Sequence, residues 1–146
     1  MFENILIPTD GSDTARDAVQ TGIDLAAEHE ATVHVLSVIK PVRSRDEGIN
    51  TDEIMEVVWE SRERHVMELA ELAEANGLVA ITEVKQGVAF RDIIDYAKNN
   101  DIDLIVMGTH GRTGLGRYLL GSVTEKVVRL SKIPVLTIHT RPKEKE

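Results

Sequence analysis

The residue types best suited to chemistry lie between Met107 and Leu130, where five glycines fall within fourteen residues: Gly108, Gly111, Gly114, Gly116 and Gly121. Glycine allows positive φ angles and lets backbone N–H groups come close to a ligand. A helix N-terminus behind such a loop offers unpaired N–H donors and a partial positive charge. This combination predicts an anion site, most often for phosphate. The alternative is a solvent-facing loop whose glycines only permit turns.

The local pattern predicts the elements on either side of this loop. The apolar run 104–106 predicts a buried strand before it. Ser122-Val123-Thr124-Glu125 predicts a capping box at the start of a helix, with Ser122 as the N-cap and Glu125 reaching back to its N–H. The expected order is therefore strand, glycine-rich loop and helix. A cap alone would also explain Ser122 and Thr124 without any ligand.

Two well-known phosphate motifs do not fit this loop. Residues 116–122 have the glycine spacing of a P-loop, but no lysine stands between Gly121 and Ser122. The side chain that contacts the β- and γ-phosphates in that motif is therefore missing. The dinucleotide fingerprint requires a third glycine where this sequence has Leu119. A nucleotide bound here would need another kind of loop.

The composition is typical of an ordinary globular protein. The 146 residues are 42% hydrophobic and 29% charged, which is enough for one domain with a full core. We expect that domain to span residues 1–140, with a charged flexible tail at 141–146. The net charge of −8 argues against nucleic-acid binding, and no apolar run is long enough to cross a membrane. The lack of cysteine and of a signal peptide favours the cytoplasm.

Apolar runs alternate with helical stripes along the whole chain. The pattern predicts five strands, at 4–8, 32–39, 79–85, 102–107 and 134–138. It predicts four helices: one from an N-cap at Ser12 to about Glu30, one over 51–76, one from after Gly87 to Asn99-Asn100, and one after Ser122. This alternation predicts the α/β class, a doubly wound parallel sheet with helices on both faces. The polar segment 41–50 is expected to be a mobile loop, and the polar patch 61–65 to interrupt the apolar face of the second helix.

Ligands of doubly wound sheets bind at the carboxyl ends of the strands, where the strand order reverses. The turn Thr9-Asp10-Gly11 follows the first strand, and the glycine-rich loop follows the fourth. If these two strands are neighbours, both turns face one crevice. Asp10 is then a candidate ligand residue, although Asx turns also favour aspartate at such a position.

Three motifs in this chain resemble the universal stress protein family, in its ATP-binding branch. They are the signature Gly108-x2-Gly111-x9-Gly121-Ser122, the N-terminal stretch 5–12 and the C-terminal stretch 131–136. The resemblance covers essentially the whole chain. It implies the strand order 3-2-1-4-5, a homodimer, and ATP in the crevice with Mg²⁺ or Mn²⁺ on the triphosphate.

The resemblance also implies which residues contact the nucleotide. Those along the adenosine would be Pro8, Thr9 and Asp10, with Val38 against the adenine. Those around the ribose and the first phosphates would be Met107, Gly108, His110 and Gly111. Those on the phosphates, through N–H and hydroxyl groups, would be Gly121, Ser122, Val123 and Thr124. Arg112 and Arg117 either screen phosphate charge or face solvent. The remaining histidines look structural or solvated: His29, His34, His65 and His139.

The fifth strand is apolar and comes last, so we expect it at an edge of the sheet, where it would aggregate unless covered. Pairing with a second copy through Val135, Leu136, Thr137 and Ile138 would cover it.

Three functions remain open: an ATP-binding regulator, a slow ATPase or phosphotransferase, and a dimeric scaffold without nucleotide. The first is favoured, because the loop has no P-loop lysine and no base beyond Asp10 or His110.

Overall fold

Five strands and four helices alternate in the computed structural model, which describes residues 1–12, 16–41, 50–109 and 121–139. The strands are β1 (Asn4–Pro8), β2 (Thr32–Ile39), β3 (Ala80–Gln86), β4 (Leu104–Gly108) and β5 (Val135–Ile138). The helices are α1 (Arg16–His29), α2 (Thr51–Ala75), α3 (Ala89–Asn99) and α4 (Ser122–Leu130). Each described element agrees with its predicted range to within one or two residues, except that α1 is described only from Arg16. Residues 13–15, which would follow the predicted cap Ser12, lie outside the described residues. So do residues 42–49 of the predicted loop 41–50, and the predicted tail 141–146.

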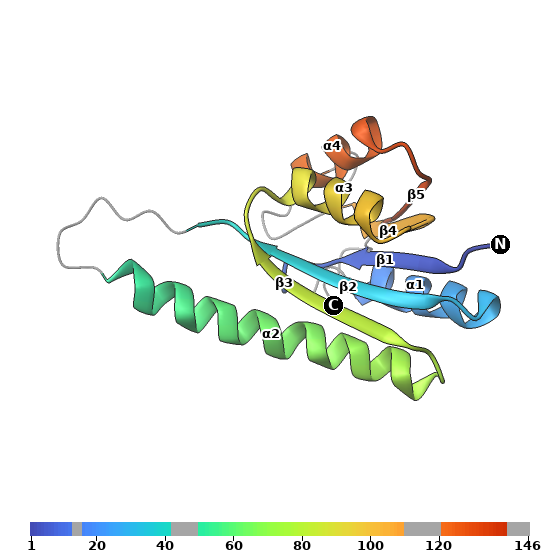
Figure 1. Cartoon of the computed structure of the whole chain (residues 1–146), viewed down its shortest axis with the longest axis horizontal. Coiled ribbons are helices and arrows are strands. Elements are labelled where there is room, and N and C mark those ends of the chain that lie inside the picture. The colour runs from blue at the N-terminus through green and yellow to red at the C-terminus, as the bar shows by residue number, and fades with distance from the viewer. Residues whose placement is uncertain (13–15, 42–49, 110–120, 140–146) are drawn as a thin grey trace, which may run out of the picture.

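The strands form one parallel sheet in the order β3-β2-β1-β4-β5, as predicted (Figure 1). Figure 1 shows α3 and α4 on one side of this sheet and α2 on the other. Burial separates the interior into two apolar clusters. Ile5 and Ile7 point into the cluster shared with α1 and α2, while Leu6 points into the cluster shared with α3 and α4. Because both faces of β1 are covered, its sequence is continuously apolar rather than alternating.

The two outer strands differ from this central one. Residues of β3 alternate between partly buried and exposed side chains, with Ile81 45% exposed. β3 is therefore a polar edge strand of the sheet. At the other edge, β5 pairs with β4 alone among the described strands.

His34 is a structural histidine, which is one of the two alternatives expected for it. Its Nδ1 lies 2.8 Å from the hydroxyl oxygen of Tyr96 on α3, and its Nε2 lies 3.1 Å from Oδ1 of Asn4. Burial lowers the pKa of His34. Burial, with a smaller contribution from the charge of Glu83, raises the pKa of Tyr96 to about 12. Both groups are therefore uncharged near neutral pH, which suits a polar contact between a strand and a helix.

The polar patch of α2 is placed differently from the expectation. None of the residues of α2 before Arg62 is buried. Arg62 within the patch, however, is only 9% exposed, and it donates to the hydroxyl of Ser37 on β2. The patch is therefore a polar contact with the sheet rather than a break in packing. No helix within the described residues is both long and apolar enough to cross a bilayer.

Candidate functional site

The predicted crevice depends on β1 and β4 being neighbours, and they are. Their paired residues are Ile5 with Leu104 and Leu6 with Ile105. From this pair, β2 and β3 extend to one side, and β5 lies on the other. The strand order therefore reverses between β1 and β4, so the segments that follow Pro8 and Gly108 leave the sheet at the same edge.

Local hydrogen bonds fix the turn after β1. The Thr9 N–H donates to the carbonyl oxygen of Leu36 over 2.9 Å, and the Gly11 N–H donates to Oγ1 of Thr9 over 3.2 Å. Oδ1 of Asp10 accepts from the N–H and the hydroxyl of Ser12, over 2.9 and 2.5 Å. Gly11 has a φ of 83°, a conformation that glycine adopts without strain. Asp10 thus forms the Asx turn that sequence reasoning offered as the alternative to a ligand role.

The two ends of the glycine-rich loop meet at the carboxyl end of β4. The Gly121 N–H donates to the carbonyl oxygen of Thr109 over 2.6 Å, and the Thr109 N–H donates to that of Ile138 over 3.0 Å. The hydroxyl of Thr124 donates to the carbonyl oxygen of Gly108 over 2.9 Å. These bonds tie the start of α4 to the end of β4. The loop between them, with His110, Gly111, Arg112 and Arg117, lies outside the described residues.

The predicted capping box is wrong. Gly121 is the N-cap of α4, no side chain caps the helix, and the exposed Ser122 is already its first residue. Helical hydrogen bonding begins at Gly121, so Ser122 lies one position too late to cap the helix. The first bond of the helix runs from the Glu125 N–H to the Gly121 carbonyl. The N–H groups of residues 122–124 precede that bond, in the position from which helices bind anions.

Three of the predicted contact residues share one apolar cluster. Met107 is buried in it, and Val38 and Val123 pack against it on the side of the sheet covered by α3 and α4. Pro8, which ends β1, is partly buried. The structure therefore brings the ends of β1, β2 and β4 and the start of α4 to one edge.

Sequence reasoning missed a second layer of this site. Nε2 of His65 lies 2.8 Å from Oγ1 of Thr9. The hydroxyl of Ser37 donates to the carbonyl oxygen of Thr9 over 2.7 Å, and Nη1 of Arg62 donates to Oγ of Ser37, also over 2.7 Å. His65 was expected to be structural or solvated. The available signal was a serine inside an apolar strand together with two polar residues, three apart, within the apolar stripe of α2.

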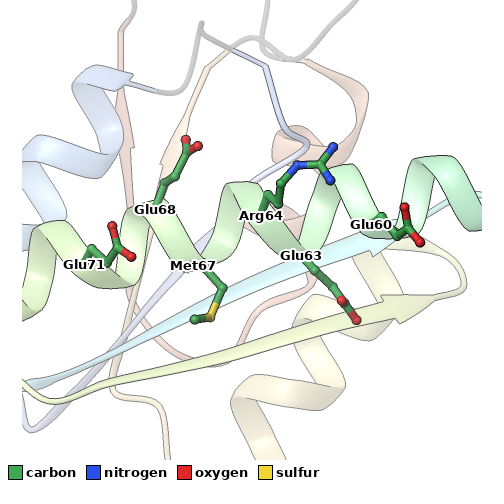
Figure 2. A pocket seen from close by; sticks show the side chains of 6 residues that line it. All are labelled: Glu60, Glu63, Arg64, Met67, Glu68 and Glu71. Atoms are coloured by element: carbon green, nitrogen blue, oxygen red, sulfur yellow. The ribbon is translucent and has the colours of Figure 1, made fainter.

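Two hollows of the described surface lie away from β4 and α4. Figure 2 shows one, of about 470 Å³, whose lining residues all come from α2: Glu60, Glu63, Arg64, Met67, Glu68 and Glu71. A second, of about 640 Å³, opens between α1 and α2, and Ser12 and His65 lie on its wall. Among the described residues, no three histidine or acidic side chains are grouped so as to hold a metal ion.

Comparison with known proteins decides the family. The profile of the universal stress protein family matches residues 1–139. This chain belongs to the universal stress protein family. The resemblance noticed in its motifs is therefore confirmed.

The similarity between this chain and individual relatives extends over most of their length. Universal stress protein MJ0531 of Methanocaldococcus jannaschii is 36% identical over 146 residues, covering 99% of this chain and 86% of the relative. The solved structure of MJ0577 from the same organism has a TM-score of 0.86 at 30% identity, covering 98% of this chain and 99% of that one. A universal stress protein solved in complex with cAMP has a TM-score of 0.74 at 25% identity, covering 96% and 99%.

Proposed function

We propose that this universal stress protein binds ATP at the edge formed by β1, β4 and the start of α4, and that it acts as a homodimeric, nucleotide-dependent regulator in the stress response. The bond from the Gly121 N–H to the Thr109 carbonyl carries this proposal. It holds the uncapped N-terminus of α4 beside the carboxyl ends of the strands, where an anion is expected. The cAMP complex of a relative supports a nucleotide as the ligand. We place the protein in the cytoplasm.

The adenosine would lie along the end of β1. The turn of Pro8, Thr9 and Asp10 supplies backbone groups at this edge, and the apolar cluster beside it contains Met107 and Val38. An apolar wall with a few polar groups is the usual composition of a small-molecule site. Gly108, with His110 and Gly111 beyond it, would approach the ribose.

The phosphates would bind the start of α4. The N–H groups of Ser122, Val123 and Thr124 precede the first hydrogen bond of the helix. The hydroxyl of Thr124 is already donated to Gly108, so we propose that Thr124 contributes its N–H and Ser122 both of its donors. Arg112 and Arg117 would screen phosphate charge.

A divalent cation would arrive with the triphosphate. The described residues contain no group of three histidine or acidic side chains that could hold it. Mg²⁺ is commonly bound through substrate phosphates, waters and one or two carboxylates rather than by a complete protein cage. Mg²⁺ or Mn²⁺ would therefore be held mainly by the phosphates, where it neutralises part of their charge.

Holding ATP fits this site better than fast hydrolysis. Phosphoryl transfer to water requires a group that orients the attacking water and charge stabilisation at the γ-phosphate. Asp10 is one candidate for that group, and its Oδ1 is already bonded to Ser12. We therefore expect slow turnover at most. A kcat near the enzyme median of about 10 per second would replace the regulator with an ATPase.

A thermal melt with and without MgATP tests the proposal, together with chromatography of nucleotide released from the denatured protein. Ligand at 100 times its Kd should add about 2.7 kcal/mol to the free energy of unfolding, a shift of several degrees. The same melt with cAMP separates a general nucleotide site from one that requires the triphosphate. No shift with either nucleotide, and none recovered, would reject nucleotide binding and leave the dimeric scaffold.

A further inference from the structure

Two side chains of α2 support the hydroxyl and the carbonyl oxygen of Thr9, at the end of β1. His65 contacts its side-chain oxygen directly, at 2.8 Å. Arg62 acts on its carbonyl oxygen through the hydroxyl of Ser37, in two bonds of 2.7 Å each. The bond from Gly11 to Oγ1 of Thr9 extends this support into the turn itself.

Three of these residues, Thr9, Ser37 and Arg62, are buried, so placing their polar groups there costs free energy. Ser37 is fully buried, Thr9 is 7% exposed and Arg62 is 9% exposed. Arginine is seldom buried unless its donors are bonded, because removing the charge from water costs free energy. An apolar side chain at position 62 would have continued the apolar face of α2. The arginine instead donates to Ser37, whose hydroxyl in turn donates to the carbonyl oxygen of Thr9.

We propose that Arg62 and His65 are positioning residues for nucleotide binding, holding the turn of Thr9 to Gly11 in the conformation that receives adenosine. This inference rests on the proposed nucleotide function. A turn that samples several conformations binds its ligand only in the fraction of time spent in the competent one, so apparent affinity falls by that fraction. The bonds from α2 raise that fraction before any ligand arrives.

The phosphate end of the site provides an internal reference. It is built on α4, on the opposite side of the sheet from α2, and its own bonds tie it to Thr109 and Gly108. Loosening Thr9 should therefore weaken the grip on adenosine and leave the anion site intact. Inorganic triphosphate probes the anion site alone, whereas ATP probes both ends.

The experiment measures Kd by calorimetry, well below the melting temperature, for MgATP and for inorganic triphosphate. His65→Leu removes the bond to Thr9, and His65→Gln keeps a side-chain amide nitrogen at comparable reach. We expect His65→Leu to bind ATP about 3- to 10-fold more weakly, the equivalent of one ordinary hydrogen bond. It should bind inorganic triphosphate as the natural protein does. His65→Gln should restore most of the ATP affinity.

Arg62 is tested in the same way, with a matched control on the same helix. Arg62→Met should weaken ATP binding, and Arg62→Lys should recover part of it. Arg64 is exposed and lies on the wall of the hollow in Figure 2, so Arg64→Met should leave both affinities unchanged. If Arg62→Met fails to fold, the His65 pair decides the question alone.

The outcomes separate this inference from the function on which it rests. If the natural protein binds no nucleotide, the proposed function fails and the positioning role fails with it. If it binds ATP and His65→Leu binds equally well, only the positioning role is overturned. The same holds if His65→Gln binds as weakly as His65→Leu, or if inorganic triphosphate is weakened as much as ATP, because a general loss of structure would produce either result.

Discussion

The hydroxyl of Thr124 donates a 2.9 Å hydrogen bond to the carbonyl oxygen of Gly108, sixteen residues earlier in the chain. Thr124 lies in the first turn of α4, and Gly108 is the last residue of β4. This bond and the neighbouring one from Gly121 to Thr109 close the base of the glycine-rich loop. The position of the helix N-terminus relative to the sheet therefore depends on a side chain, and it can be tested by changing that side chain.

Thr124→Val should lower the free energy of unfolding by about 1 to 3 kcal/mol, because Gly108 loses a buried donor while the volume of the side chain is kept. Thr124 is 5% exposed, so water cannot readily replace the hydroxyl. Thr124→Ser keeps the hydroxyl and loses one methyl group, which should cost about 1 kcal/mol. Urea unfolding without nucleotide measures the free energy of unfolding of both variants. Equal stability of the valine and natural proteins would show that the bond contributes nothing.

Gly121→Val should weaken nucleotide binding without unfolding the chain. The φ and ψ of Gly121 are −58° and 153°, which any residue adopts without strain. The effect of a side chain here would therefore come from the space that it takes beside the first N–H groups of α4. We expect a loss of affinity of about tenfold, roughly 1.4 kcal/mol, with a smaller loss for Gly121→Ala. Unchanged affinity in a folded Gly121→Val would place the phosphates elsewhere.

Leu136→Lys should convert the proposed dimer to a monomer. Leu136 lies on the edge strand β5 and is 36% exposed, so a charge there would face the second copy. Leu72→Lys on α2 is a matched control, because Leu72 is also exposed and lies on another element. Light scattering at micromolar concentration should give a dimer for the natural protein and the control. A monomeric natural protein would rule out the proposed interface.

Stability should fall as pH drops below about 6.5, partly because of His34. Burial lowers the pKa of His34 in the folded protein from its usual 6.5. At pH values between that lowered pKa and 6.5, the unfolded chain therefore binds a proton at His34 that the folded protein does not bind. The free energy of unfolding therefore decreases as pH falls through this range and is unaffected by His34 above it. His34→Gln should reduce this dependence, measured as urea midpoints at several pH values. His139→Gln, at an exposed position, should keep the pH dependence of the natural protein. If the free energy of unfolding changed equally with pH in both variants, the prediction would be contradicted.

Most of the fold follows from patterns that are local in sequence. The runs at 4–8 and 104–106 are apolar on both faces, and this identifies them as central strands without knowledge of their partners. The alternation of strands and helices then restricts the sheet to a parallel, doubly wound one. The order β3-β2-β1-β4-β5 was expected from the family resemblance, and it agrees with the observed pairing.

The glycine-rich loop and the family are determined by the sequence alone, because glycine spacing and a following helix can be recognised without any distant residue. Only the structure decided that Gly121 rather than Ser122 is the N-cap of α4, because the first helical hydrogen bond is accepted by the carbonyl oxygen of Gly121. Only it brought His65 and Arg62 to Thr9, more than fifty residues away in the chain. A polar side chain is satisfied by whichever group the packing places within about 3 Å, and that distance depends on how helices and strands dock, which periodicity does not encode.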